Sequence, residues 1–312
     1  MKYISQVTLI SVSIALIIVS FNVNAYNVSD EVSVCNSALE KGDLTTATSV
    51  AAKILKHEAS NRGALLCKGR ALGSQSQDSQ GNYNEALSAL ELALKNSQAG
   101  LEQIITTIFI GNLHRKNNQN AEAIASYEKS LNISRVEKNE KFERINLNFI
   151  GDTYTQNKDL NAALTSYLAG FKLSMNDNER AESYEHLAAT YSALGQHDLA
   201  IEHQLKAMLM QQKAGTLDDV ANANYVLGQT YQNAKEYDNA ESAYSKLLQF
   251  SKDNGGAYYE AKANFGLAQV KAAKGEKDSA KIMFLDTLKM AKNIGENELA
   301  AEIDVALNKL NN

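Results

Sequence analysis

Two cysteines, Cys35 and Cys67, have the most reactive side chains in this sequence of 312 residues. An oxidising compartment would favour a disulfide between them. If they occupy equivalent positions on neighbouring parallel helices, those helices are offset by about 8–10 Å, whereas a disulfide needs Cα atoms about 4.4–6.8 Å apart. The sequence therefore leaves two alternatives open: a Cys35–Cys67 disulfide, or two small packing residues.

The other residues that could do chemistry are not arranged for it. Two metal ligands on one helix face are three or four residues apart, but His197 and His203 are separated by six. Glu182 and Glu185 share a helix face, where a solvated surface explains them better than acid–base catalysis does. No HExxH, GxSxG, P-loop or GxGxxG motif is present. We therefore expect no catalytic residue, no metal site and no cofactor.

Composition favours a helical chain that does not bind nucleic acid. Lysine and arginine total 31 and aspartate and glutamate total 36, so the formal net charge is −5. A protein that binds the phosphate backbone needs a basic surface, which this balance does not supply. Proline, the residue that most strongly breaks helices, is absent. The elements that position any functional residue are therefore expected to be helices.

Residues 1–25 have the features of a secretion signal. Lys2 supplies the positive charge, residues 7–21 form an uncharged apolar run, and Val23, Asn24 and Ala25 precede the expected cleavage site. The run of 15 residues (21 − 7 + 1) is shorter than the roughly 20 that span a bilayer. An uncleaved membrane anchor is therefore the less favoured alternative. We expect a periplasmic or secreted bacterial protein without stable membrane insertion.

The sequence repeats itself. A small residue recurs twelve positions ahead of an alanine at Gly111 and Ala123, Gly151 and Ala163, Ala188 and Ala200, Gly228 and Ala240, and Ala268 and Ala280. The alanines at positions 47, 86, 123, 163, 200, 240 and 280 are separated by 39, 37, 40, 37, 40 and 40 residues. This period indicates repeated helical hairpins whose two helices approach closely at the small residues.

The flanking residues resemble the tetratricopeptide repeat. Leu227, Gly228, Tyr231, Ala240 and Tyr244 follow that family's order L-G-x-x-Y…A-x-x-x-Y/F, and the tyrosine of the first helix is expected to fill the wedge between the helices. The resemblance covers about residues 29–292 and implies an all-α, right-handed superhelical solenoid of about seven repeats. The family's period is about 34 residues, so a period near 40 predicts longer helices.

We expect three regions: a signal peptide over residues 1–25, a repeat array over residues 26–294, and a C-terminal capping helix within residues 295–312. Residues 297–310 are amphipathic, as a helix that covers the end of a solenoid must be. The polar residues 73–82 lengthen the second repeat and are expected to form a loop.

The resemblance also implies a binding surface, because the first helix of each repeat lines a concave groove in this family. The positions that face it are Ile105, Ile108, Asn112, Arg115, Lys116, Asn148, Asp152, Asn222, Tyr225, Gln229, Gln232 and Phe265. Their amides suit the backbone of an extended peptide, and Ile105, Ile108, Tyr225 and Phe265 are expected to receive apolar side chains. An ordinary solvated groove is the alternative.

The favoured function is a non-catalytic scaffold of the bacterial cell envelope that binds an unidentified protein or peptide segment in this groove. One alternative is a peptide-sensing regulatory module that changes its superhelical pitch. Another is an accessory factor of an envelope secretion or assembly system.

Overall fold

The computed structural model describes residues 28–76 and 80–311, which form fifteen α-helices. Their bounds are α1 (Val28–Glu40), α2 (Leu44–His57), α3 (Arg62–Ser74), α4 (Gln80–Lys95), α5 (Leu101–Lys116), α6 (Asn120–Val136), α7 (Glu140–Gln156), α8 (Leu160–Phe171), α9 (Asp177–Ala193), α10 (His197–Ala214), α11 (Leu217–Asn233), α12 (Tyr237–Asn254), α13 (Ala257–Ala273), α14 (Lys277–Asn293) and α15 (Asn297–Asn311). They pack as consecutive antiparallel pairs, with α15 after the seventh pair. The expected all-α solenoid is confirmed.

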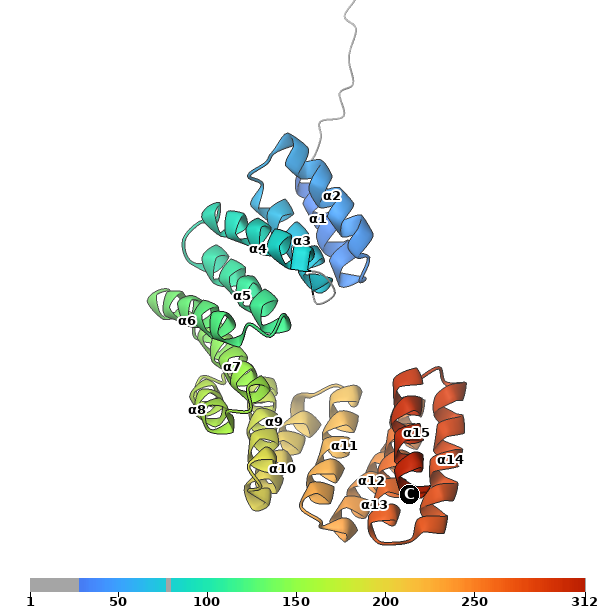
Figure 1. Cartoon of the computed structure of the whole chain (residues 1–312). Helices are drawn as coiled ribbons and strands as arrows, with labels where there is room; N and C mark the ends of the chain where they lie inside the picture. Colours follow the sequence, from blue (N-terminus) through green and yellow to red (C-terminus); the bar gives the residue numbers. More distant parts are fainter. Residues whose placement is uncertain (1–27, 77–79, 312) are drawn as a thin grey trace, which may run out of the picture.

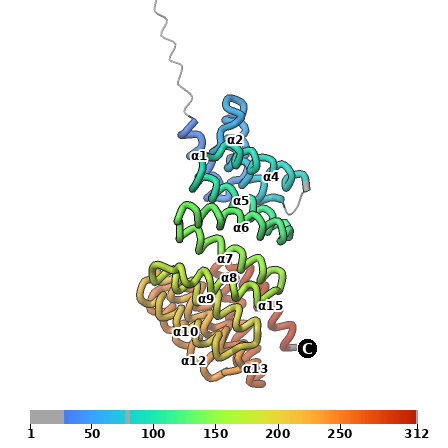
Figure 2. Tube along the Cα trace, turned by 90° about the vertical axis from the view of Figure 1, so that its left-hand side faces the viewer, coloured from blue at the N-terminus to red at the C-terminus, as the bar shows by residue number. Residues whose placement is uncertain are grey.

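The pairs stack into an open arc with two arms. Helices α1–α6 form one arm, α11–α15 form the other, and the chain bends through α7–α10 (Figure 1). In the view turned by 90°, the pairs from α1 to α6 follow one another toward the bend, and the later helices overlap one another (Figure 2). The first helices of neighbouring pairs contact one another within each arm. Helix α1 contacts α3, and α11 contacts α13.

A glycine on the first helix and a tyrosine on the second set the spacing of several pairs. A Cβ atom added to Gly151 would lie 2.6 Å from Cε1 of Tyr167. The same contact occurs between Gly111 and Tyr127 at 2.5 Å, and between Gly228 and Tyr244 at 2.4 Å. Only a residue without a side chain lets the tyrosine ring lie flat against the facing helix.

These rings belong to the second helices, which differs from the sequence-based expectation. Tyr127 and Tyr244 are fully buried, whereas Tyr154, Tyr191 and Tyr231 of the first helices are only partly buried. The first-helix tyrosines lie near the end of their helix, where the two helices separate toward the turn. They therefore cover the edge of the core, and the second-helix tyrosines fill its centre.

The turn inside each of the middle pairs needs a left-handed backbone conformation. Asn118, Lys158, Gly195, Lys235 and Gly275 all have positive φ angles between 59° and 87°. They occupy equivalent places, one residue after the C-cap of the first helix. The repeat is therefore regular in its turns as well as in its helices, even where a lysine adopts the conformation that glycine favours.

Cys35 on α1 and Cys67 on α3 form a disulfide, and their Cα atoms lie 6.3 Å apart. This distance is shorter than the ordinary offset of neighbouring helices, so α1 and α3 approach closely where the two small residues meet. Both cysteines are also fully buried, packed with Ala47 and Ala51 of α2. Closing a loop of this length stabilises a fold by roughly 3–4 kcal/mol in the chain-entropy model. The bridge therefore joins the first two described pairs covalently.

The expected loop at residues 73–82 is partly helical, and the expected C-terminal helix packs on the last pair. The predicted signal peptide lies outside the described residues. Within residues 73–82, α3 continues to Ser74 and α4 begins at Gln80, so part of the expected loop is helical. At the other end, Leu299, Ile303 and Leu307 of α15 are buried against the core of the last pair. No described helix has the length and apolar character needed to cross a bilayer.

We predict that Gly151→Leu destabilises the array by about 1–3 kcal/mol or more, because the new side chain collides with the Tyr167 ring. Ala189→Leu is the matched control, since Ala189 is exposed in the middle of a first helix. Thermal unfolding followed by circular dichroism measures both variants. Coincident melting curves for the two variants would contradict the assignment of the packed face.

Candidate functional site

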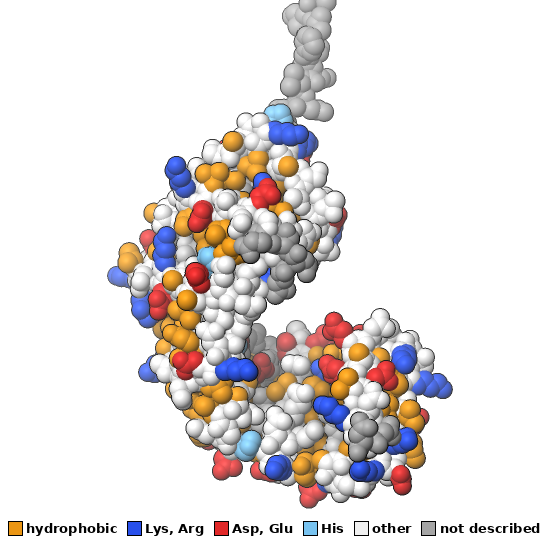
Figure 3. Space-filling view, viewed as in Figure 1, with side chains coloured by type: hydrophobic (Ala, Val, Ile, Leu, Met, Phe, Trp, Pro, Cys, Tyr) orange, Lys and Arg blue, Asp and Glu red, His pale blue; other side chains and the backbone are white. Residues whose placement is uncertain are grey.

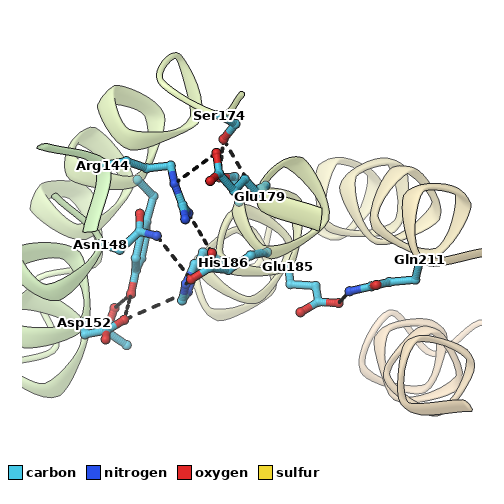
Figure 4. A network of polar contacts seen from close by, with 12 residues as sticks. Arg144, Asn148, Asp152, Ser174, Glu179, Glu185, His186 and Gln211 are labelled. Atoms are coloured by element: carbon cyan, nitrogen blue, oxygen red, sulfur yellow. Dashed lines mark hydrogen bonds and ion pairs between the residues drawn. The ribbon is translucent and has the colours of Figure 1, made fainter. Parts of the chain in front are cut away.

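The first helix of each pair lines the concave side of the arc, which appears as a wide hollow between the two arms (Figure 3). Three pockets lie along these helices. One is formed by α3 and α5, and two adjoin each other between α11, α13 and α15. Between them, at the bend, polar side chains join α7 to α9 (Figure 4). The concave face thus has an N-terminal pocket, a central polar joint and a C-terminal pair of pockets.

The N-terminal pocket encloses about 190 Å³ and is basic. The guanidinium of Arg70 lies 4.8 Å from the ring centroid of Phe109 and donates a hydrogen bond to Oδ1 of Asn36 at 3.2 Å. Burial lowers the pKa of Arg70 from its ordinary value, and Glu40 opposes that shift. Lys116 lies at the edge of the pocket and donates to the backbone oxygen of Ser74. This pocket offers two cations beside an aromatic ring.

An ion pair joins the N-terminal arm to the central joint. Nη1 of Arg115 on α5 lies 3.0 Å from Oδ2 of Asp152 on α7. The guanidinium also lies 5.6 Å from the ring centroid of Phe149. Gln156 donates to the backbone oxygen of Arg115 at 3.3 Å. Arg115 and Asp152 therefore join neighbouring repeats.

The junction between α7 and α9 is held by charged side chains. Arg144 is buried, with its Nη1 2.6 Å from Oε2 of Glu182 and its Nε 3.6 Å from Oε2 of Glu179. Asn148 donates to Glu182 at 3.5 Å. His186 stacks on the Tyr167 ring with centroids 4.6 Å apart and an angle of 7°. These charged contacts join α7 to α9 beside an apolar cluster that includes Ala163, Tyr167 and Leu187.

The pKa of Glu182 falls to about 2 in these surroundings. The hydrogen bond with His186 is the largest cause of this lowering, and the contact with Arg144 lowers the pKa further. Burial of the carboxylate acts in the opposite direction. One turn away, burial raises the pKa of Glu185, whose carboxylate accepts a hydrogen bond from Gln211 at 3.4 Å. The pKa values of these two glutamates of α9 are therefore shifted in opposite directions.

The C-terminal pockets adjoin each other on α11, α13 and α15. The larger encloses about 540 Å³ and is lined by Gln232, Phe265, Gln269, Ala272, Phe284, Glu302, Val305, Ala306, Lys309 and Leu310. The smaller encloses about 260 Å³ and is lined by Asn222, Tyr225, Val226, Gln229, Tyr258, Lys262, Glu296, Glu298, Leu299 and Glu302. Glu302 lines both. Together they form a continuous hollow on the concave face of the C-terminal arm.

Buried tyrosines orient the polar side chains of the concave face. The hydroxyl of Tyr127 donates to Oδ1 of Asn112 at 2.6 Å, and that of Tyr167 donates to Oδ1 of Asp152 at 2.8 Å. Similarly, Tyr244 donates to Oε1 of Gln232 at 3.1 Å. Burial raises the pKa of all three tyrosines, so each remains a donor. Each ring packs against a helix while its hydroxyl fixes a residue of the groove.

The structure divides the expected groove residues into three groups. Asn112 and Lys116 lie in the N-terminal pocket, and Asn222, Tyr225, Gln229, Gln232 and Phe265 line the C-terminal pockets. Arg115, Asn148 and Asp152 belong to the internal contacts described above. Ile105 is half-buried and lines none of these three pockets.

One register position is more buried than expected. Ile108, Asn148 and Tyr225 precede the small residue of their helix by three, and they are 7%, 6% and 5% exposed. Phe265, at the same position, is 4% exposed. Side chains at this position pack within the array, as Tyr225 does against Tyr244 and Phe265 against Phe284. Ile108 is therefore a core residue, whereas Tyr225 and Phe265 still form pocket walls.

Several lining residues were missed by sequence reasoning. Lys262 and Tyr258 on α13 were omitted, although Lys262 is six residues before the small residue Ala268, as Asn222 is before Gly228. Glu302 and Val305 were missed because α15 was assigned only a covering role. Applying the same register to every first helix would have identified Lys262. Nothing in the repeat pattern identifies the residues of α15, because no second helix pairs with it among the described residues.

Within residues 28–76 and 80–311, no three histidine, cysteine, aspartate or glutamate side chains lie close enough together to hold a metal ion. The arrangement of the concave face instead consists of amides, aromatic rings and separated charges. Such a surface can form hydrogen bonds and apolar contacts with a chain laid across it.

Comparisons with known proteins give the following matches. Models of the tetratricopeptide repeat match residues 108–136, 179–252 and 219–293. No curated protein sequence matches the chain.

Solved structures show similar folds. Aspartyl phosphate phosphatase F from Bacillus subtilis is 14% identical with a TM-score of 0.61, and the match covers 89% of this chain and 78% of that one. BtubC from P. vanneervenii is 17% identical with a TM-score of 0.55, covering 74% and 93%. A Rap protein complexed with Competence and Sporulation Factor is 13% identical with a TM-score of 0.50, covering 91% and 97%.

We predict opposite pH dependences for two variants of α9. The folded-state pKa of Glu182, about 2, lies below the ordinary 4.5, so its carboxylate stabilises the fold above that value and less as the pH falls toward 2. The free energy of unfolding of the native protein minus that of Glu182→Gln should therefore shrink as the pH falls. Urea unfolding at a series of pH values measures this difference.

Glu185→Gln serves as the comparison. Because the folded-state pKa of Glu185 is raised, its contribution to stability is present at low pH and lost as the pH rises through that pKa. The same difference in free energy should therefore grow as the pH falls toward 4.5. Parallel pH dependences for the two variants would contradict the opposite surroundings assigned to Glu182 and Glu185.

Proposed function

The chain is a tetratricopeptide-repeat protein, and we propose that it is a non-catalytic scaffold that binds a protein or peptide segment along its concave face. One observation supports this proposal most strongly: five residues assigned to the groove from the sequence line the adjoining C-terminal pockets. Amide side chains there can pair with a peptide backbone, while aromatic walls can bury side chains. The Rap protein that has a similar fold was solved in complex with a factor.

The binding proposal is tested by crosslinking and capture from intact cell envelopes. Gln229→Lys alters the exposed concave face of α11, and Gln249→Lys makes the same change on the exposed surface of α12. We expect Gln229→Lys to reduce recovery of a stoichiometric partner by roughly five- to thirtyfold, the effect of one or two kcal/mol. Gln249→Lys should recover as much partner as the native protein. Equal recovery with both variants would argue against the concave face.

The proposed compartment is the bacterial periplasm or the exterior of the cell. Residues 1–25 support export, and a disulfide between Cys35 and Cys67 is suited to an oxidising compartment. Exported protein is therefore expected to begin near Tyr26, with both cysteines protected from alkylation until a reductant is added. Intact mass spectrometry before and after reduction measures both properties. Retention of residues 1–25 would contradict cleavage, and two reactive thiols would contradict the bridge.

A second candidate function is a peptide sensor that changes its superhelical pitch. The charged contacts between α7 and α9 favour it, because ion pairs and hydrogen bonds between repeats can exchange partners when the repeats move. Small-angle scattering with and without the captured segment distinguishes the two functions. A scaffold should keep its dimensions, whereas a sensor should change its radius of gyration.

A further inference from the structure

Helices α11, α13 and α15 form a trough at the C-terminal end of the arc, and its two pockets follow one another along the helix axes. The smaller pocket takes Tyr258 and Lys262 from α13, and the larger takes Phe265, Gln269 and Ala272 from later turns of the same helix. Glu302 of α15 stands between them. The trough therefore has two subsites in a fixed order.

The larger subsite is apolar at its base and polar at its edge. The rings of Phe265 and Phe284 form the base, with centroids 5.8 Å apart. Val305 is 54% exposed on the wall formed by α15. Gln232 and Gln269 line the same pocket from α11 and α13. A volume of about 540 Å³ accommodates a large apolar side chain and part of its backbone.

The smaller subsite already attracts a cation. The Nζ atom of Lys262 lies 4.1 Å from the ring centroid of Tyr225 and 5.2 Å from that of Tyr258. Cations bind to the faces of such rings within about 6 Å. The ring faces that attract this ammonium would equally attract the ammonium or guanidinium of a partner.

The wall formed by α15 in the same subsite is acidic. Glu296, Glu298 and Glu302 all line it, and none of the three forms an ion pair within the described part of the chain. Lys262 is the one basic residue in the lining, so the subsite has an excess of negative charge. Its charge complements a basic side chain, and a flexible lysine stem allows Lys262 to withdraw.

The two subsites are separated by about 13 Å, since the middle of Tyr258–Lys262 and the middle of Phe265–Ala272 are eight or nine helical residues apart at about 1.5 Å each. Four residues of an extended chain span roughly the same distance at about 3.3 Å each. Residues four apart in an extended chain also point to the same side. An extended peptide can therefore fill both subsites at once.

We propose that the trough binds an extended segment of a partner protein that carries a basic side chain and, four residues away, a large apolar side chain. This proposal depends on the proposed scaffold function and specifies its ligand. The basic side chain lies between the rings of Tyr225 and Tyr258 and the carboxylate of Glu302, replacing the ammonium of Lys262. The apolar side chain enters the pocket over Phe265 and Phe284.

The test is selection of phage-displayed random octapeptides on the purified protein. We expect enrichment of peptides with lysine or arginine four residues from leucine, methionine or phenylalanine, in one orientation. Glu302→Lys and Val305→Arg should each weaken the best enriched peptide by tenfold or more in fluorescence anisotropy. Asp304→Lys on the same helix and Ile282→Arg on α14 are matched controls at exposed positions outside both pockets, and should leave the affinity unchanged.

Lys262→Gln separates a binding role from a role in folding. Removing the competing ammonium should make the enriched peptide bind at least threefold more tightly, whereas damage to the fold would weaken binding. Unchanged or weaker binding to this variant would overturn the position given to the basic side chain.

The other outcomes also decide the proposal. Enrichment of a different pattern that is insensitive to Glu302→Lys and Val305→Arg would overturn the trough as the site while the scaffold function stands. Absence of any enriched peptide would overturn the peptide ligand proposed here. The partner capture with Gln229→Lys and Gln249→Lys would then decide the scaffold function separately.

Discussion

The contact between a glycine on one helix and a tyrosine ring on the next is the constraint on which the rest of this structure depends. At Gly111, Gly151 and Gly228 it lets two helices approach until a methyl group would collide with the ring. The same tyrosines extend their hydroxyls to the concave face, where they hold Asn112, Asp152 and Gln232. Packing and surface chemistry are therefore coupled: the groove residues keep their orientation because the pairs keep their spacing.

This coupling explains why the concave face is not uniform. At the bend, Asp152 accepts hydrogen bonds from Tyr167 and Arg115, so its carboxylate is already used within the array. At the C-terminal arm, Tyr244 engages only the carbonyl oxygen of Gln232, and the amide nitrogen of that side chain keeps its donors. The middle of the face therefore consolidates the arc, while its C-terminal arm retains groups that a ligand can use.

The fold was predictable because its signals repeat, and the site was less so because its residues do not. A twelve-residue spacing of small residues located every pair from α5–α6 to α13–α14 and indicated their packed faces. The depth of Ile108 and Asn148 was not predictable, since it depends on how closely neighbouring first helices approach. The separation of Cys35 and Cys67 depends on the same quantity. Periodicity specifies which side of a helix a residue occupies, but the distance to the next repeat is a property of the assembled array.

Helix α15 lies outside the repeat pattern, so its contribution to the site was the hardest to predict from periodicity. A helix that ends a solenoid is expected to bury one face and present a polar outer face to solvent. Leu299, Ile303 and Leu307 of α15 satisfy the first requirement, yet Val305 remains 54% exposed beside the aromatic base of a pocket. A helix that served only as a cover would gain solubility from a polar residue at that position. The exposed valine, and Glu302 on the preceding turn, which forms no ion pair with the described residues, are accounted for if α15 both packs on the core and forms one wall of the binding trough.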